Sequence, residues 1–336
     1  MARRFTVLFT AVGRRGALVK LFRKALAEMG LDGRILGADL SATAPAMYLV
    51  DKGYLVPRAT APEYVDALES ICRRETVDLV VPTIDPELPV LAEIRDRFSA
   101  FGTTLHVSAP ATVAIGFSKD RTHQWLTEQG LPTVRQWSQA EAMETGNALP
   151  YPVVVKPRQG SASIGVSVAK GLDELRWAMR DGGEYVVQEK APGREYTVSA
   201  YVDQSGAVRC LVPRLRMEVR AGEVSKGRSE RNEPVRNVVR QLCEALPEAW
   251  GALNVQVFYE KESGTCRIIE MNPRFGGGYP LAWEAGAKFP IWLAQEVLGL
   301  ECDANDEWED GLTMLRYDEA VFVRQGEPDR FSKVSL

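Results

Sequence analysis

Alternation of short apolar strands with amphipathic helices is the feature that most constrains how residues 1–109 can fold. An apolar run over 5–12 predicts a strand, Gly13-Arg14-Arg15-Gly16 follows it, and the spacing over 17–29 predicts a helix. Further elements are expected as strands at 34–38 and 77–82, a helix at 64–74, and later pieces near 88–98 and 104–107. Such alternation is typical of a parallel, doubly wound sheet. We therefore expect an α/β fold that opens with this domain.

The pattern changes after about residue 109. A helix over 118–129 ends at Gly130-Leu131-Pro132, and a glycine-rich segment and a strand-rich stretch over 185–270 follow. We predict a second domain over 110–300, with a small lid subdomain at about 115–190 and a central subdomain at about 191–300. An acidic C-terminal extension over 301–336 carries one strand candidate at 313–324.

Composition excludes several classes of function. The formal net charge of -4 lacks the basic excess that nucleic-acid binding needs. No apolar run is long enough to span a membrane, and the start of the chain is unlike a signal peptide, so we expect a cytoplasmic protein without a membrane partner. Five dispersed cysteines without a CxxC pair suggest neither disulfides nor zinc, and two histidines leave the chemistry to carboxylates, amides and cations.

The first chemical motif is a β-branched strand that ends in Lys156 and runs into a loop of small residues over 160–165. Backbone N–H groups of such a loop can cover polyphosphate oxygens. The motif is not a P-loop, because the lysine precedes the glycines. An exposed lysine beside a solvated glycine turn explains the segment equally well.

The second motif, over 184–198, reads as two strands joined by a short hinge. An extended hinge exposes backbone groups that can bind an adenine edge, and Glu195 just beyond it is a candidate for the ribose hydroxyls. A charged β-hairpin is the alternative interpretation.

The third motif combines Asn254 and Gln256 on one strand with Glu270 and Asn272 on another. If both strands are regular, each pair shares a face, and adjacent strands would present four oxygen ligands together. Mg²⁺ prefers such oxygens and needs no histidine. Polar residues that merely end strands are the alternative, but their apolar neighbours imply burial, and buried polar groups need partners.

In this order, the three motifs resemble the ATP-grasp superfamily, and specifically the single-module proteins similar to half of a carbamoyl-phosphate synthetase large subunit. The resemblance covers the chain to about residue 300. It implies a pre-ATP-grasp Rossmann-like domain followed by an ATP-grasp fold of two α+β subdomains.

The resemblance also implies roles for individual residues. Phosphate contacts would come from Lys119, Lys156 and the loop residues Gly160, Ser161, Ser163 and Gly165, with Lys226 as a further cation. The nucleoside would lie at Glu189, Lys190 and Glu195. One Mg²⁺ would lie between Gln256 and Glu270, a second between Glu270 and Asn272, and Arg274 would steady the transferring phosphate.

The implied activity is that of an ATP-dependent, ADP-forming carboxylate-amine ligase. It would form a C–N bond through an acyl phosphate, with ATP and two Mg²⁺ as cofactors and Mn²⁺ as a substitute. The expected partners are a small-molecule carboxylate, such as an amino acid, and an amine, with a homodimer as one possible assembly. The alternative is a carbamoyl-phosphate-synthetase-like carboxyphosphate or carbamate phosphorylation, although this sequence shows one module and no glutamine-amidotransferase nucleophile.

Three pairs of residues are candidates for substrate binding. Arg14 and Arg15, at a helix start, could bind a carboxylate or phosphate, and Arg214 and Arg216 could face an anionic substrate. Asp85 and Glu87 follow a strand end and could hold an ammonium. Solvent exposure explains the arginines equally well, and a capped turn explains the two carboxylates.

Two rival functions are open at this point. Gly13, Gly16 and Asp39 invite a dinucleotide-dependent oxidoreductase reading, but Ala11 replaces the first glycine of GxGxxG. A non-catalytic nucleotide-binding protein is the other.

Overall fold

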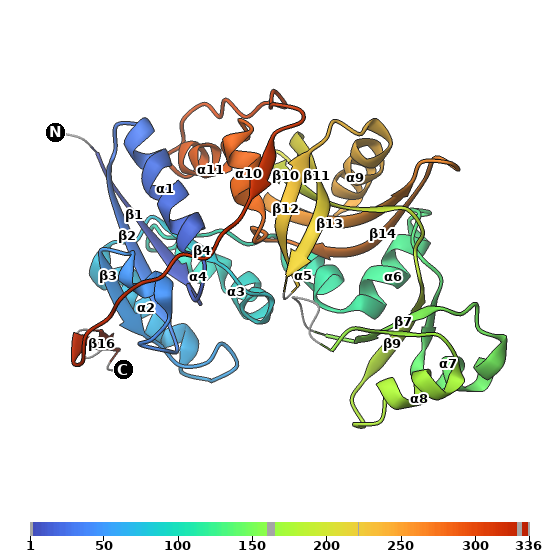
Figure 1. The fold of residues 1–336 in the computed structure, drawn as a ribbon. Helices are drawn as coiled ribbons and strands as arrows, with labels where there is room; N and C mark the ends of the chain where they lie inside the picture. Colours follow the sequence, from blue (N-terminus) through green and yellow to red (C-terminus); the bar gives the residue numbers. More distant parts are fainter. Residues whose placement is uncertain (1–2, 160–164, 221, 328–330, 335–336) are drawn as a thin grey trace.

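Three β-sheets organise the residues that this computed structural model describes, which are 3–159, 165–220, 222–327 and 331–334. The first sheet has six parallel strands, and it lies at the left of Figure 1. In spatial order they are β16 (Ser332–Lys333), β3 (Lys52–Leu55), β2 (Asp32–Asp39), β1 (Arg4–Thr10), β4 (Leu79–Pro82) and β5 (Thr104–Leu105). The expected α/β fold with an N-terminal parallel sheet is confirmed.

Helices cover both faces of this sheet because its strands are apolar on both sides. Alternate residues of β1 divide between two cores, so that Phe5, Val7 and Phe9 pack with helix α1 (Gly16–Glu28) and Leu8 packs with helix α2 (Tyr64–Glu75). The remaining helices of this part are α3 (Leu88–Glu93), α4 (Arg95–Ser99) and α5 (Pro110–Phe117), with 3-10 turns at Pro45–Tyr48 and Asp85–Glu87.

The second sheet is antiparallel and lies next to the first. Its spatial order is β14 (Thr265–Asn272), β13 (Gly251–Glu260), β10 (Arg194–Val202), β11 (Val208–Arg220), β12 (Glu223–Ser229) and β15 (Thr313–Leu315). Helix α9 (Glu233–Ala245) and helix α6 (Lys119–Glu128) pack on one face. Helices α10 (Tyr279–Glu284) and α11 (Phe289–Val297) pack on part of the other face and against α1.

Helix α9 shows why the covered face is apolar. Asn232 caps its start by accepting a hydrogen bond from the Val235 N–H at 3.2 Å, and Val235, Val238, Val239 and Leu242 recur at helical spacing and are buried. Burying each such side chain contributes about 1.5–3 kcal/mol relative to exposing it. These residues therefore fix the helix on one face of the antiparallel sheet. The opposite face of the sheet is left for other groups.

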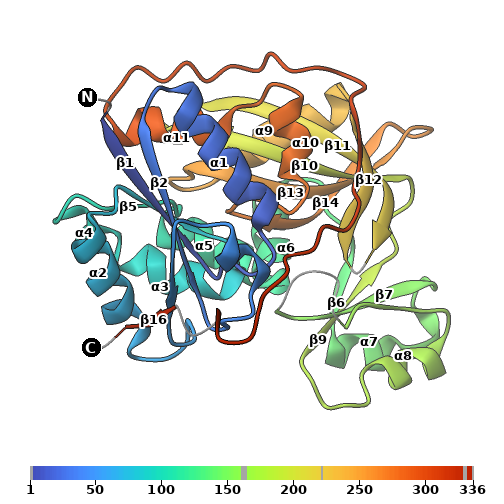
Figure 2. The same ribbon diagram turned by 60° about the vertical axis from the view of Figure 1, so that its left-hand side comes forward.

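The third sheet is a small lobe with its own core. Its strands are β6 (Gln136–Ser138), β9 (Tyr185–Glu189), β7 (Val153–Pro157) and β8 (Ser167–Ala169), and helices α7 (Gln139–Thr145) and α8 (Leu172–Ala178) cover it, with a 3-10 turn at Gly146–Ala148. Figures 1 and 2 both place this lobe at the lower right, away from the parallel sheet.

One strand was not predicted, and one predicted strand is shorter than expected. The sequence of β3 has no continuous apolar run that would predict a strand, because Lys52 and Gly53 interrupt the pattern. The strand expected over 313–324 extends only over Thr313–Leu315. The chain then crosses beside α1 and adds β16 to the edge of the parallel sheet (Figure 2). Within the described ranges, no helix is both long and apolar enough to cross a bilayer.

Candidate functional site

A row of polar side chains crosses four strands of the antiparallel sheet. Thr197 of β10 is paired with Arg214 of β11 on one side and with Gln256 of β13 on the other, and Gln256 is paired with Glu270 of β14. Residues paired across neighbouring strands point to the same face. The polar residues therefore share the face opposite α9, which makes this face the candidate site.

A second row lies two residues further along the same strands. Asn254 of β13 is paired with Ser199 of β10 and with Asn272 of β14. The Asn272 Nδ2 donates a hydrogen bond to Glu270 Oε1 at 3.0 Å, so the two rows are connected. The predicted pairing of these residue types on adjacent strands is present.

Strand β14 is not regular at this point. Gln256 is paired with Glu270 whereas Val257 is paired with Ile268, so Ile269 is an extra residue in β14. Such a bulge changes the direction of nearby side chains and is common beside active sites. The irregularity lies directly before Glu270, where the sequence argument assumed a regular strand.

The donor atoms fit a magnesium ion. Gln256, Glu270 and Asn272 supply one carboxylate and two amide oxygens, which are hard ligands of the kind that Mg²⁺ prefers, with nucleotide phosphates to complete the shell. Among the described residues, no group of three or more His, Cys, Asp or Glu could hold a metal. A metal bound by Gln256, Glu270 and Asn272 would therefore depend on the two amides and the carboxylate of Glu270.

Lys156 brings a cation from the small lobe to this face. It lies near the end of β7, and burial together with nearby Lys119 lowers the pKa of its ammonium, while Glu270 and Glu195 act in the opposite direction. Lys156 is therefore within electrostatic reach of both carboxylates. Lys119 begins α6, and its backbone N–H donates to Arg158 O at 3.2 Å.

Arg214 is buried without a carboxylate partner in the described part of the chain. Its Nη2 donates to Asn254 Oδ1 at 3.0 Å, and its Nε has no hydrogen-bond acceptor there. Burial, and secondarily the charge of Arg216, lowers the pKa of Arg214 to about 9. A buried cation that an amide alone compensates is costly, so this position favours an incoming anion.

Arg216 of β11 and Glu195 of the neighbouring strand β10 form an ion pair. The Arg216 Nε lies 3.3 Å from Glu195 Oε1, and Arg216 Nη2 donates to Gly222 O at 3.3 Å. Burial raises the pKa of Glu195, while Arg216 and Lys156 act to lower it. Glu195 therefore faces the polar side of the sheet, where a role at the ribose stays a prediction.

Other predicted nucleotide contacts have partners within the chain. Glu189 ends β9, lies 3.7 Å from Arg267 Nε, and uses its backbone N–H to bind Arg135 O at 3.0 Å. Lys190 follows it and is exposed. Lys226 Nζ lies 2.7 Å from Glu218 Oε2 on an exposed part of β12. The structure leaves these assignments as predictions.

Most of the loop in the first motif lies outside the described residues. Gly160, Ser161 and Ser163 lie outside the described residues, so the predicted phosphate contacts stay predictions. Gly165 is described and has φ +73°, a left-handed conformation that favours glycine.

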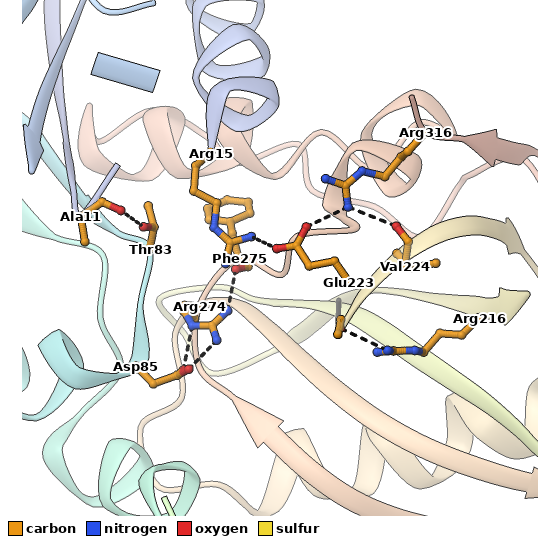
Figure 3. Close-up of polar contacts among 11 residues, drawn as sticks. Ala11, Arg15, Thr83, Asp85, Arg216, Glu223, Val224, Arg274, Phe275 and Arg316 are labelled. Carbon is orange, nitrogen blue, oxygen red and sulfur yellow. Dashed lines mark hydrogen bonds and ion pairs between the residues drawn. The ribbon is translucent and has the colours of Figure 1, made fainter. Parts of the chain in front are cut away.

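Arg274 and Asp85 bind each other. Arg274 Nε and Nη2 donate to Asp85 Oδ1 and Oδ2 at 2.7 and 2.5 Å, and Nη1 donates to Phe275 O at 3.1 Å (Figure 3). Arg274 is buried. This bidentate pair joins the turn after β4 to the loop after β14, so residues that the sequence assigned to phosphate and to ammonium lie together.

Glu87 is not brought to this group. It is buried and accepts hydrogen bonds from Thr10 Oγ1 at 2.9 Å and from the Tyr64 hydroxyl at 2.6 Å. Burial raises its pKa to about 7. Its carboxylate is therefore an internal link between β1 and α2, which does not support the ammonium-binding role predicted for it.

Asp39 also has an internal role. Its Oδ2 accepts from the Gly13 N–H at 2.8 Å and its Oδ1 from the Ser41 N–H at 2.9 Å. The carboxylate thus holds the β1–α1 loop. This use weakens the dinucleotide interpretation, which needs Asp39 to accept ribose hydroxyls.

Three consecutive glycines lie between these groups. A Cβ on Gly276 would clash with Asn254 Oδ1, one on Gly278 would clash with Arg214 Nη1, and one on Gly277 would lie 2.8 Å from Arg15 Nη1 and from Glu223 Oε1. The glycines therefore let the loop after β14 touch three polar groups at once.

Sequence reasoning missed two residues near Arg15. Glu223, at the start of β12, lies 3.3 Å from Arg15 Nη1 and binds Arg316, which follows β15 (Figure 3). Arg14 beside them is exposed. No spacing rule connects residues so far apart in the chain.

Two family models match successive parts of the chain. A PylC-like N-terminal domain model matches residues 7–106, and an ATP-grasp domain model matches residues 117–278.

Curated relatives match parts of longer proteins. A formate-dependent phosphoribosylglycinamide formyltransferase of Synechococcus sp. (strain RCC307) is 35% identical over 159 residues, covering 46% of this chain and 38% of that protein. A carbamoyl phosphate synthase large chain of Thermotoga sp. (strain RQ2) is 23% identical over 323 residues, covering 89% of this chain and 29% of that protein. The chain thus spans less than half the length of either relative.

Solved structures share the fold. An N5-carboxyaminoimidazole synthetase from Staphylococcus aureus complexed with ADP has a TM-score of 0.71 at 16% identity, covering 92% of this chain and 81% of that one. An L-amino acid ligase from Bacillus licheniformis has a TM-score of 0.69 at 19% identity, covering 89% and 75%. With the two domain matches in the order that the motifs predicted, the chain belongs to the ATP-grasp superfamily and carries a PylC-like N-terminal domain.

Proposed function

We propose that the chain is an ATP-dependent, ADP-forming ligase that joins a carboxylate substrate, such as an amino acid, to an amine. The observation that carries the proposal is the polar sheet face, where Gln256 and Glu270 offer oxygen ligands and buried Arg214 has no carboxylate partner among the described residues. Structural relatives named as a synthetase complexed with ADP and as an L-amino acid ligase support the same class of reaction.

In this proposal, Lys156 and Lys119 bind the nucleotide phosphates, and Gln256, Glu270 and Asn272 hold two Mg²⁺ ions, for which Mn²⁺ could substitute. Bound Mg²⁺ would neutralise phosphate charge and orient the γ-phosphate. The amide oxygens and the carboxylate come from paired strands, so their separation is fixed by the sheet rather than by a loop.

The reaction proceeds in two steps. A substrate carboxylate oxygen attacks the γ-phosphorus, the bond to the β,γ-bridging oxygen breaks, and ADP leaves. The amine then attacks the acyl carbon and loses a proton, and inorganic phosphate leaves as the C–N bond forms. Two unit charges 4 Å apart repel by about 4 kcal/mol at an effective dielectric of 20, so the first step needs cations around both anions. Lys156 and Arg214 supply them in this proposal.

The test is an assay of ADP and phosphate release with pairs of amino acids, in which the product is identified by mass. Turnover should require both a carboxylate and an amine, and Glu270→Gln should abolish it, while Glu262→Gln, at the exposed turn between β13 and β14, should not. Turnover that needs bicarbonate instead of an amino-acid carboxylate would favour the carbamoyl-phosphate-synthetase-like alternative. Full activity of Glu270→Gln would refute the site.

A further inference from the structure

Five charged side chains meet where the two large sheets adjoin, and we call them the charge cluster. They are Arg15, Asp85, Glu223, Arg274 and Arg316 (Figure 3). They come from the β1–α1 loop, the turn after β4, the start of β12, the loop after β14 and the segment after β15. The charge cluster thus joins residues that lie as far apart in the sequence as Arg15 and Arg316.

The cluster contains more positive than negative charge. Arg274 and Asp85 neutralise each other through two hydrogen bonds. The single carboxylate of Glu223 is shared, with Oε1 3.3 Å from Arg15 Nη1 and Oε2 2.8 Å from Arg316 Nη1. One guanidinium charge is therefore in excess, and both of these arginines compete for one carboxylate.

The directions of the pKa shifts in the cluster agree with this excess of positive charge. Burial, followed by the charges of Arg274 and Arg316, lowers the pKa of Arg15 against the opposing effect of Glu223. Burial alone would raise the pKa of Glu223, but Arg316, Arg15 and Arg14 outweigh it and lower that pKa. The local potential therefore favours a further negative charge.

Arg316 is held firmly although it lies in the C-terminal segment. Its backbone N–H donates to Ser225 O at 2.9 Å and its Nη1 donates to Val224 O at 3.1 Å. Glu319, three residues on, accepts hydrogen bonds from Lys20 of α1 at 2.8 and 2.9 Å. Binding by Arg316 would therefore cost little ordering entropy.

The cluster borders the polar sheet face. Gly277 packs against the Arg15–Glu223 pair, and its neighbours Gly276 and Gly278 pack against Asn254 and Arg214 of the face. A molecule that reaches from the face past this loop would meet the two arginines.

We propose that Arg15 and Arg316 bind a second anionic group of the substrate, a carboxylate or a phosphate, and that Glu223 occupies this position when no substrate is bound. The inference rests on the proposed ligase function, and it defines the substrate as a carboxylate with an additional anionic group, as in an acidic amino acid. Binding exchanges the internal Glu223 contact for a contact with the ligand.

The test measures binding to the full chain without turnover, by calorimetric titration with succinate and with inorganic phosphate. Arg316→Gln should weaken binding at least tenfold, and Glu223→Gln should strengthen it severalfold because it removes the competing carboxylate. Arg324→Gln, whose side chain is 91% exposed and 4.0 Å from Glu327, is the control and should change nothing. The probe that binds more tightly identifies the anionic group.

A purely structural role of the charge cluster would give a different result. If the cluster served only to join the sheets, Arg316→Gln and Glu223→Gln would both lower the melting temperature and neither would alter the affinity for succinate or phosphate. That result, or the absence of binding by both probes to the unmodified chain, overturns the inference.

Assays of ADP release test this inference separately from the proposed ligase function. The chain should release ADP faster with L-glutamate than with L-glutamine as the carboxylate substrate, and Arg316→Gln should remove the preference by raising KM for L-glutamate. Equal turnover of both substrates overturns the second-anion inference and leaves the ligase proposal standing. Succinate binding that depends on Arg316, without ADP release from any substrate pair, supports the anion site and refutes the ligase proposal.

Discussion

Replacing Arg214 by methionine should stabilise the ligand-free protein and remove its activity. The two effects have one cause, because the guanidinium is buried beside an amide and lacks a carboxylate partner in the described part of the chain. Without an anion the charge is a cost, and with one it becomes a binding contact. Methionine keeps much of the volume and removes the charge.

The magnitude follows from the protonation equilibrium. The pKa of Arg214 falls from 12.5 to about 9, which at about 1.36 kcal/mol per pKa unit corresponds to roughly 5 kcal/mol against the charged form. At pH 7 the group is protonated in both the folded and the unfolded chain, so the full cost is present and declines only as the pH rises above about 9. Losing the charged hydrogen bond to Asn254 offsets about 1.5–3 kcal/mol. The expected net gain is about 2–3.5 kcal/mol in the free energy of unfolding.

The assay is urea unfolding at pH 7 with and without MgADP, together with ADP release under the proposed assay conditions. Arg214→Met should raise the free energy of unfolding without ligand and release ADP at least a hundredfold more slowly. Arg216→Met, two residues away, is the matched control, and it should lower the free energy of unfolding by about 2 kcal/mol because it leaves Glu195 unpaired. A destabilised Arg214→Met variant, or one with unchanged turnover, refutes the reasoning.

Three other changes give separate checks. Glu270→Gln removes the carboxylate of the proposed metal site, and kcat should fall at least a thousandfold with little change in the unfolding midpoint, whereas a fall in both would indicate a structural role. Lys156→Ala should weaken MgADP binding about tenfold in a calorimetric titration, and an unchanged affinity would move the phosphate site elsewhere. Burial raises the pKa of Glu87 to about 7, so the folded chain binds the proton more tightly than the unfolded chain does. Stability should therefore fall by up to about 3 kcal/mol as the pH rises from about 4.5 to above 7. Urea unfolding across that range should show no such fall for Glu87→Gln, and parallel profiles would contradict the argument.

Sequence reasoning selected those residues of the candidate site that a local pattern encodes. Gln256 and Glu270 lie on strands with period-two alternation, and Lys156 ends a β-branched run, so residue type and spacing were enough to select them. Pairing of β13 with β14 was also predictable, because a short turn joins them. The extra residue Ile269 was not, since a bulge has no reliable signature in a single sequence.

Sequence reasoning could not predict contacts between segments that are far apart in the chain. Nothing in the sequence near Arg316 indicates that it binds Glu223, and these residues meet because β15 pairs with β12. The same limit explains Glu87, where the acidic pattern after β4 suggested a ligand-binding turn. Its partner Tyr64 lies on α2 and becomes visible only once the helix is packed on the sheet.

The run Gly276-Gly277-Gly278 shows how one short segment can set the geometry of two proposed anion-binding regions. None of the three has the left-handed φ that would demand glycine, so the reason for glycine is space. A side chain at any of them would push the loop away from Asn254, from the Arg15–Glu223 pair or from Arg214. Since the loop is continuous with β14, such a shift would also move Asn272. The polar face and the charge cluster are therefore not independent, and a substitution chosen to alter the substrate should avoid this loop.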